Sequence, residues 1–173
     1  MNIICFGDSN TYGYDPRSYL GGRYAPDSRW VDNFGWTVCN TGQNGREIPT
    51  VALSFHTDTD LLIVMLGTNA LLQGRSPEQA AERLNRFLSG RSLNRSKILL
   101  IAPPPVQLGA WVPNQQLIDD SRTFARLCRT LAEQLGIRFA DAGKWVISLA
   151  YDGVHFTEQG HRAFAPGLLE VLK

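Results

Sequence analysis

The sequence has little of what metal sites, redox centres and membrane spans require. Its 173 residues include three cysteines and three histidines, and no two cysteines have the C-x-x-C spacing of a zinc or redox motif. We expect Cys5, Cys39 and Cys128 to be core thiols of a protein from a reducing compartment. No apolar run approaches the roughly 20 residues that cross a bilayer. We therefore expect neither a metal nor membrane insertion.

An excess of charge of one sign is also missing. The formal net charge is +1, and the nearest approach to a basic cluster is Arg83, Arg86, Arg91 and Arg95. We interpret these arginines as the solvated side of a helix and a loop, so nucleic acid is not an expected partner. The chain opens on the strand-like run MNIICF, without the pattern of a signal peptide, and a soluble cytoplasmic protein is the default expectation.

What the sequence does contain is a series of short apolar runs, each closed by turn-forming residues. They lie at 2–6, 36–40, 60–66, 97–102 and 137–142. Continuous rather than alternating apolar runs are typical of strands that are buried on both faces, as in a parallel sheet. A chain of this length can bury a sizeable core. We expect residues 1–173 to form a single domain.

Helical patterns separate these runs. The clearest begins at Ser76, an N-cap candidate that Pro77 follows at the first helical position. Regular helical spacing predicts further helices over 114–136 and 157–173, and a shorter one over 48–56. Alternation of strands and helices implies right-handed crossovers and a three-layer α/β sandwich. The long irregular stretches, 14–29 and 102–113, are expected to be functional loops.

Polar clusters follow the predicted strands. They are Asp8-Ser9-Asn10, the segment from Asn40 to Arg46, Gly67-Thr68-Asn69-Ala70 and, before the last helix, Asp152-Gly153-Val154-His155-Phe156. In open parallel sheets, sites gather beyond the carboxyl ends of the strands. The first three clusters would then lie along one edge of the sheet, and the fourth would fold back over it.

Together these clusters hold the parts of an acyl-transfer site. Ser9 supplies a hydroxyl on a strand-to-helix turn, His155 supplies a base, and Asp152 lies three residues earlier, close enough to orient the imidazole. Donors for an oxyanion come from the backbone N–H groups of Ser9 and Gly45 and from the side-chain amide of Asn69. Each cluster alone is an ordinary turn, but their combination at successive strand ends favours a catalytic interpretation.

The four stretches FGDSNTYGY, NTGQNGRE, VMLGTNA and DGVHFTEQGH resemble the sequence blocks of the SGNH hydrolases, also called the GDSL-like esterase/lipase family. The resemblance is closest to the arylesterase- and acyltransferase-like branch. It implies a flavodoxin-like αβα sandwich with five parallel strands in the order 2-1-3-4-5. It also implies the roles given above for Ser9, Asp152, His155, Asn69 and Gly45.

Two positions of these blocks need comment. Gly42 and Gly45 both offer an N–H, and the G-x-N-G-R form of the branch favours Gly45. The third block usually reads Gly-Thr-Asn-Asp, whereas Ala70 stands here in place of the aspartate. We expect Asn69 to keep its role, with one polar support of its loop missing.

The predicted function is that of a serine esterase that acts on small carboxylic esters through an acyl-Ser9 intermediate and needs no cofactor. Residues predicted to bind the substrate are Asn10, Leu71, Leu72, Trp111 and Val154. A carbohydrate or peptidoglycan O-acetyl esterase, or a thioesterase, would use the same site. A non-catalytic flavodoxin-like module that binds a flavin or an anion is the alternative from another class. The oligomeric state stays open, and a homo-oligomer is compatible with the sequence.

Overall fold

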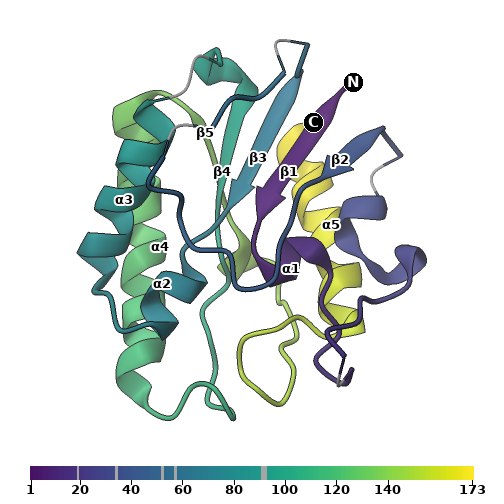
Figure 1. Ribbon diagram of the computed structural model, residues 1–173, viewed down its shortest axis with the longest axis vertical. Helices are drawn as coiled ribbons and strands as arrows, with labels where there is room; N and C mark the ends of the chain where they lie inside the picture. The colour runs from purple at the N-terminus through teal and green to yellow at the C-terminus, as the bar shows by residue number, and fades with distance from the viewer. Residues whose placement is uncertain (19, 34, 52, 57, 91–92) are drawn as a thin grey trace.

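The computed structural model describes residues 1–18, 20–33, 35–51, 53–56, 58–90 and 93–173. Within these ranges, five parallel strands form one sheet in the order β2-β1-β3-β4-β5 (Figure 1). The strands are β1 (Ile3–Gly7), β2 (Val38–Asn40), β3 (Leu61–Met65), β4 (Ile98–Ala102) and β5 (Arg138–Asp141). The predicted strand order is therefore confirmed.

The central strands are apolar throughout because both faces of the sheet are covered. Ile4 of β1 and Leu62 of β3 belong to the core on one face, and Ile3 and Ile63 belong to the core on the other. Neighbouring residues of a strand point to opposite faces, so a strand buried on both sides has no polar positions to alternate with. This explains why six consecutive apolar residues, Leu61 to Leu66, are buried.

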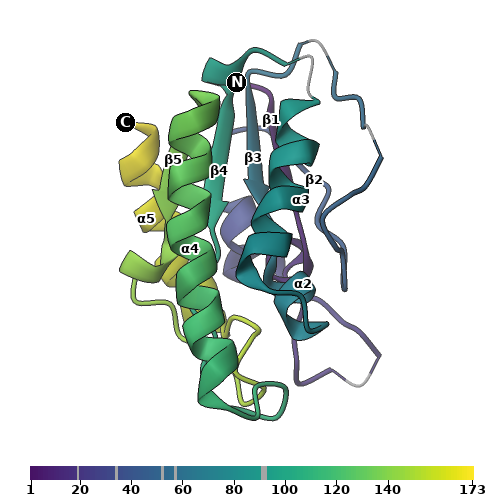
Figure 2. The ribbon, with the colours of Figure 1, turned by 90° about the vertical axis from the view of Figure 1, so that its left-hand side faces the viewer.

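Helices cover the two faces and make the three predicted layers (Figures 1 and 2). One face carries α2 (Thr68–Leu72), α3 (Pro77–Ser89) and α4 (Gln115–Leu135). The other carries α5 (Glu158–Leu172), which packs beside two 3₁₀ turns, η1 (Pro26–Ser28) and η2 (Trp30–Asp32). The shortest helix, α1 (Ser9–Tyr12), lies at the end of β1.

The helix caps are those expected from the sequence. Ser76 and Gln79 form a reciprocal capping box at the start of α3, and Thr157 accepts from the Gly160 N–H at the start of α5. Gly136 ends α4 in the left-handed conformation. Pro166 lies inside α5 without dividing it.

Two expectations about structure are wrong. No helix forms in the described part of 48–56, residues 48–51 and 53–56. Instead, Ile48 is buried in the core and the Phe55 ring packs edge-on against Phe6, so contacts distant in sequence hold these two residues. Cys39 is exposed because β2 is a short edge strand, whereas Cys5 and Cys128 are buried as expected.

The carboxyl ends of the strands bring distant segments together. β1 runs into α1, and β3 runs into α2, at the same end of the sheet (Figure 1). The segment 150–156 returns to this end after β5, and the segment 107–112 pairs with it through backbone bonds. Those bonds run from the N–H of Ala110 to the oxygen of Tyr151 at 3.1 Å and from the N–H of Trp111 to the oxygen of Asp152 at 3.0 Å.

Candidate active site

Ser9 is held at the turn between β1 and α1. The strand ends at Gly7, and the Asp8 side chain caps α1 by accepting the N–H of Asn10 at 3.0 Å. This cap closes the turn tightly and leaves Ser9 as the first residue of the helix. Ser9 is largely buried, yet its side chain lines a pocket at the end of the sheet.

His155 lies between the serine and a carboxylate. Its Nε2 is 3.0 Å from the Oγ of Ser9, and its Nδ1 is 2.7 Å from Oδ2 of Asp152. The other oxygen of Asp152 accepts the backbone N–H groups of Val154 and His155, both at 2.9 Å. The carboxylate therefore shapes the turn that carries the imidazole as well as contacting the imidazole itself.

The environment of Asp152 keeps its charge. Burial alone would raise the pKa of this carboxyl, but the hydrogen bonds from the His155 ring and from the backbone N–H groups lower the pKa below its usual value. An ionised Asp152 accepts a hydrogen bond from an Nδ1 that carries the ring proton. The lone pair of Nε2 is then directed at Ser9. These contacts are the ones that a nucleophile beside an oriented base would require.

A pocket of about 260 Å³ opens above Ser9. It is lined by Ser9, Tyr14, Asn44, Gly45, Asn69, Trp111 and His155. The structure thus brings together every residue predicted as nucleophile, base or oxyanion donor, with Asp152 behind the base. Their catalytic roles stay predictions that activity measurements must test.

The structure distinguishes between Gly42 and Gly45, the two glycines whose N–H groups were candidates for the oxyanion donor. Gly42 donates its N–H to Oδ1 of Asn40 at 2.9 Å and packs so tightly against the backbone of Tyr12 that a Cβ would lie 2.3 Å from its nitrogen. Gly45 lines the pocket and has a φ of 70°, a left-handed conformation that favours glycine. This geometry favours Gly45 as the donor.

Two aromatic rings flank the His155 imidazole. The ring centroid of Tyr14 lies 4.6 Å from that of His155, and the centroid of Trp111 lies 4.9 Å away in an edge-on arrangement. Trp111 was predicted to bind substrate, and it does line the pocket. Tyr14 was missed, although it is the last residue of the first block, FGDSNTYGY, and this place is a signal that could have found it.

The four other predicted substrate-binding residues do not line this pocket. Asn10 is buried and links two loops, donating to the oxygen of Val154 at 3.1 Å and accepting the N–H of Phe156 at 2.9 Å. Val154 belongs to a small core cluster. Leu71 is buried in the main core and, with Leu72, touches a separate hollow beyond Trp111. All four residues lie outside the Ser9 pocket, and their part in substrate binding stays a prediction.

Two charged groups lie beside the site, and one of them, Arg46, was assigned no role from sequence. Asp8, the cap of α1, is buried, and burial raises the pKa of its carboxyl to about 6 despite the Asn10 N–H and the nearby His155 and Arg46. Arg46 ends the loop that carries Gly45, and its backbone oxygen accepts the amide of Asn69 at 3.0 Å. Its position directly after the Gly45 turn was the available signal.

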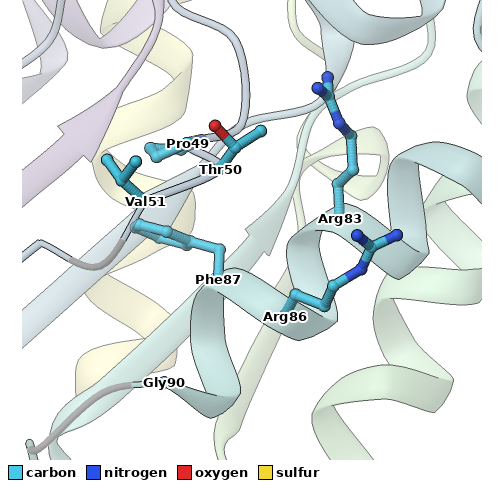
Figure 3. A pocket seen from close by; sticks show the side chains of 7 residues that line it. All are labelled: Pro49, Thr50, Val51, Arg83, Arg86, Phe87 and Gly90. Carbon is cyan, nitrogen blue, oxygen red and sulfur yellow. The ribbon is translucent and has the colours of Figure 1, made fainter.

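A further hollow lies at the C-terminal end of α3 (Figure 3). It shares no residue with the Ser9 pocket, and its lining includes Arg83, Arg86 and the Phe87 ring. Both arginines are paired, Arg83 with Glu47 at 2.9 Å and Arg86 with Glu82 at 2.9 Å. The basic cluster seen in the sequence is thus in part a set of ion pairs on the surface of α3.

Neither a metal cluster nor a membrane span is found in the described ranges. No group of three or more His, Cys, Asp and Glu side chains among these residues is arranged to hold a metal ion. Likewise, none of their helices combines the length and apolar character needed to cross a bilayer.

Comparison with models of protein families assigns the chain to one family. Residues 5–163 match the model of the GDSL-like lipase/acylhydrolase family. The match covers all four polar clusters and most of the chain, so this protein belongs to that family and is an ester-hydrolysing enzyme. No curated protein sequence is similar enough to the chain to count as a match.

Solved structures with the same architecture agree with this assignment. A carbohydrate acetylesterase family member from Sinorhizobium meliloti has a TM-score of 0.81 at 25% identity, over 99% of this chain and 96% of that one. The native aryl esterase of M. smegmatis has a TM-score of 0.80 at 27% identity, over 99% of this chain and 97% of that one. The chain is similar to both along almost its whole length.

Proposed function

We propose that this enzyme hydrolyses small carboxylic esters through an acyl intermediate on Ser9. The observation that supports it most directly is the unbroken series Asp152–His155–Ser9, with contacts of 2.7 and 3.0 Å. His155 accepts the Ser9 proton at Nε2 while the oxygen attacks the ester carbonyl. Asp152 stabilises the imidazolium that forms. His155 then gives the proton to the departing alcohol, and water releases the acid by the reverse sequence.

The charge that develops on the carbonyl oxygen needs donors. The proposed donors are the backbone N–H groups of Ser9 and Gly45 and the side-chain amide of Asn69, and all three residues line one pocket. Donors fixed in a partly buried site stabilise a developing oxyanion more than water does, because they need no reorganisation as the charge appears. The volume of about 260 Å³ supports a short acyl group.

The test is steady-state hydrolysis of p-nitrophenyl acetate by Ser9→Ala. We expect kcat to fall by about three orders of magnitude or more, with residual rate from the oxyanion donors alone. Ser89→Ala, an exposed serine on α3, is the matched control and should keep full activity. Wild-type activity in a folded Ser9→Ala variant would remove Ser9 from the mechanism.

A second substrate class, O-acetylated carbohydrate, has its own support. Beside the Ser9 pocket and sharing Tyr14 with it lies a hollow of about 440 Å³ lined by Tyr14, Pro16, Arg17, Ser18 and Tyr151. Tyr151 is exposed there. Exposed tyrosine rings beside polar groups suit the apolar and hydroxylated faces of a sugar. Release of acetate from acetylated xylo-oligosaccharides, compared with p-nitrophenyl acetate, distinguishes the two classes.

A further inference from the structure

Arg46 adjoins both proposed oxyanion donors that lie outside α1, Gly45 and Asn69. It directly follows Gly45 in the chain, and its backbone oxygen accepts the Nδ2 of Asn69 at 3.0 Å. An amide nitrogen carries two hydrogens. The bond to Arg46 occupies one of them and leaves the other for the pocket that Asn69 lines.

The guanidinium of Arg46 is hydrogen-bonded both to its own loop and to the end of β1. It donates to the oxygen of Gly7 at 3.2 Å, to the oxygen of Thr41, and to Oε1 of Gln43 at 3.1 Å. Its centre also lies 4.2 Å from the centroid of the Phe6 ring. One planar group thus joins both ends of the 41–46 loop to the strand that ends at the nucleophile, a task that suits the fixed fork of an arginine.

The position is costly for a cation. Burial lowers the pKa of Arg46, and the nearby Asp8 carboxyl acts in the opposite direction. Asp8 is also the cap of the helix that begins with Ser9. The charge of Arg46 is therefore stabilised by Asp8, which caps the helix that begins with Ser9. The backbone oxygen of Arg46 in turn holds the amide of Asn69.

We infer that Arg46 is the positioning residue of the oxyanion site: its side chain fixes the Gly45 turn against the end of β1, and its carbonyl aims the Asn69 amide. Arg46 does not line the Ser9 pocket, so it acts through these two donors and not on the substrate. The inference rests on the function proposed above and adds a residue that was assigned no role in it from the sequence.

A double-mutant cycle tests this inference. Arg46→Ala, Asn69→Ala and the double variant are assayed with p-nitrophenyl acetate, and their melting temperatures are measured in parallel. Loss of one oxyanion donor costs about 10²–10³ in kcat, so we expect Asn69→Ala in that range and Arg46→Ala within about tenfold of it. KM should change little in either, because the donors act on the transition state. Arg46→Ala keeps the backbone carbonyl but frees the loop that holds it, so part of its effect passes through Asn69 and part through Gly45. The double variant should therefore lose clearly less than the product of the two single losses.

Two further variants exclude a general loss of structure. Arg46→Lys keeps the positive charge but lacks the planar fork, so its kcat should lie between those of wild type and Arg46→Ala. Arg83→Ala removes a comparable, partly buried arginine that pairs with Glu47, next in sequence to Arg46, and it should keep kcat within about twofold of wild type. If Arg46→Ala does not fold, the cycle is run with Arg46→Lys.

Several results would overturn the inference. They are a folded Arg46→Ala with wild-type kcat, a double variant whose loss equals the product of the single losses, and a rise in KM that accounts for the whole effect. Failure of the proposed function looks different, because Ser9→Ala would then stay active. A dead Ser9→Ala together with a fully active Arg46→Ala would reject only the role of Arg46.

Discussion

At the scale of single residues, we propose that the Asp152 carboxylate fixes the tautomer of His155. In Asp152→Asn, the amide would offer N–H to Nδ1 of His155 and favour the tautomer with its proton on Nε2. That tautomer cannot take the Ser9 proton, so kcat for p-nitrophenyl acetate should fall by about four orders of magnitude at neutral pH. The oxygen of the new side chain can still accept the Val154 N–H, so the melting temperature should change little. A loss below tenfold would show that Asp152 does not orient His155.

His161 supplies a prediction about pH and stability. Its ring is fully buried between those of Tyr24 and Phe156, and among the described residues its two nitrogens have no hydrogen-bond partner. Burial, with smaller contributions from the nearby Arg29 and His155, lowers its pKa from 6.5 to about 3. Between these values the unfolded chain binds a proton that the folded protein excludes.

The free energy of unfolding should therefore fall as the pH drops from 6.5 towards 3, by up to about 1.4 kcal/mol per pH unit from this residue. His161→Leu removes the titrating group, so urea unfolding at several pH values should give a shallower decline for this variant. Parallel declines for the two proteins would mean that His161 is protonated in the folded state.

At the scale of elements, the segment 107–112 sets one wall of the site. It is fixed by backbone bonds to the segment 150–153, and it presents Trp111, about half of whose surface is exposed. Trp111 lines the Ser9 pocket and also a hollow of about 530 Å³ that Leu72 and Leu117 help to line. The indole thus borders two spaces.

Trp111→Ala should join these spaces and shift the preference for acyl length. We expect the enlarged space to bury two methylenes of the octanoyl chain that wild type leaves in water, which contributes about 1.6 kcal/mol. The ratio of kcat/KM for p-nitrophenyl octanoate to that for the acetate should therefore rise about tenfold. Leu117→Ala in the Trp111→Ala background should reduce that gain, because Leu117 lines the second hollow and not the Ser9 pocket. Equal losses for all chain lengths would instead assign Trp111 to the support of His155.

The elements also show where sequence reasoning reaches its limit. The strands were predictable because runs such as Leu61 to Leu66 are apolar on both faces, and the α3 start was predictable because Ser76 and Pro77 are local signals. The segment 48–56 was not, because its shape depends on distant contacts such as that of Phe55 with Phe6. The spacing of apolar residues along a short segment does not show which distant residues the segment will contact.

At the scale of the whole molecule, the site depends on topology. Ser9 and His155 are 146 residues apart in sequence, and they meet because the parallel sheet places the ends of β1 and β3 side by side while the segment 150–156 returns over them. The sequence predicted this meeting and the residues in it. It did not predict Tyr14 and Arg46, whose places follow from ring packing and from a loop that turns back on β1.

The most direct measurement is covalent labelling with a fluorophosphonate, followed by peptide mapping of the modified residue. Attack by the Ser9 oxygen on phosphorus displaces fluoride, so the account predicts one label per chain, on the peptide that contains Ser9. The His155→Ala variant should label far more slowly, because no base is then left to take the proton. A label on another residue, or equal rates with and without His155, would contradict the claim that His155 activates Ser9.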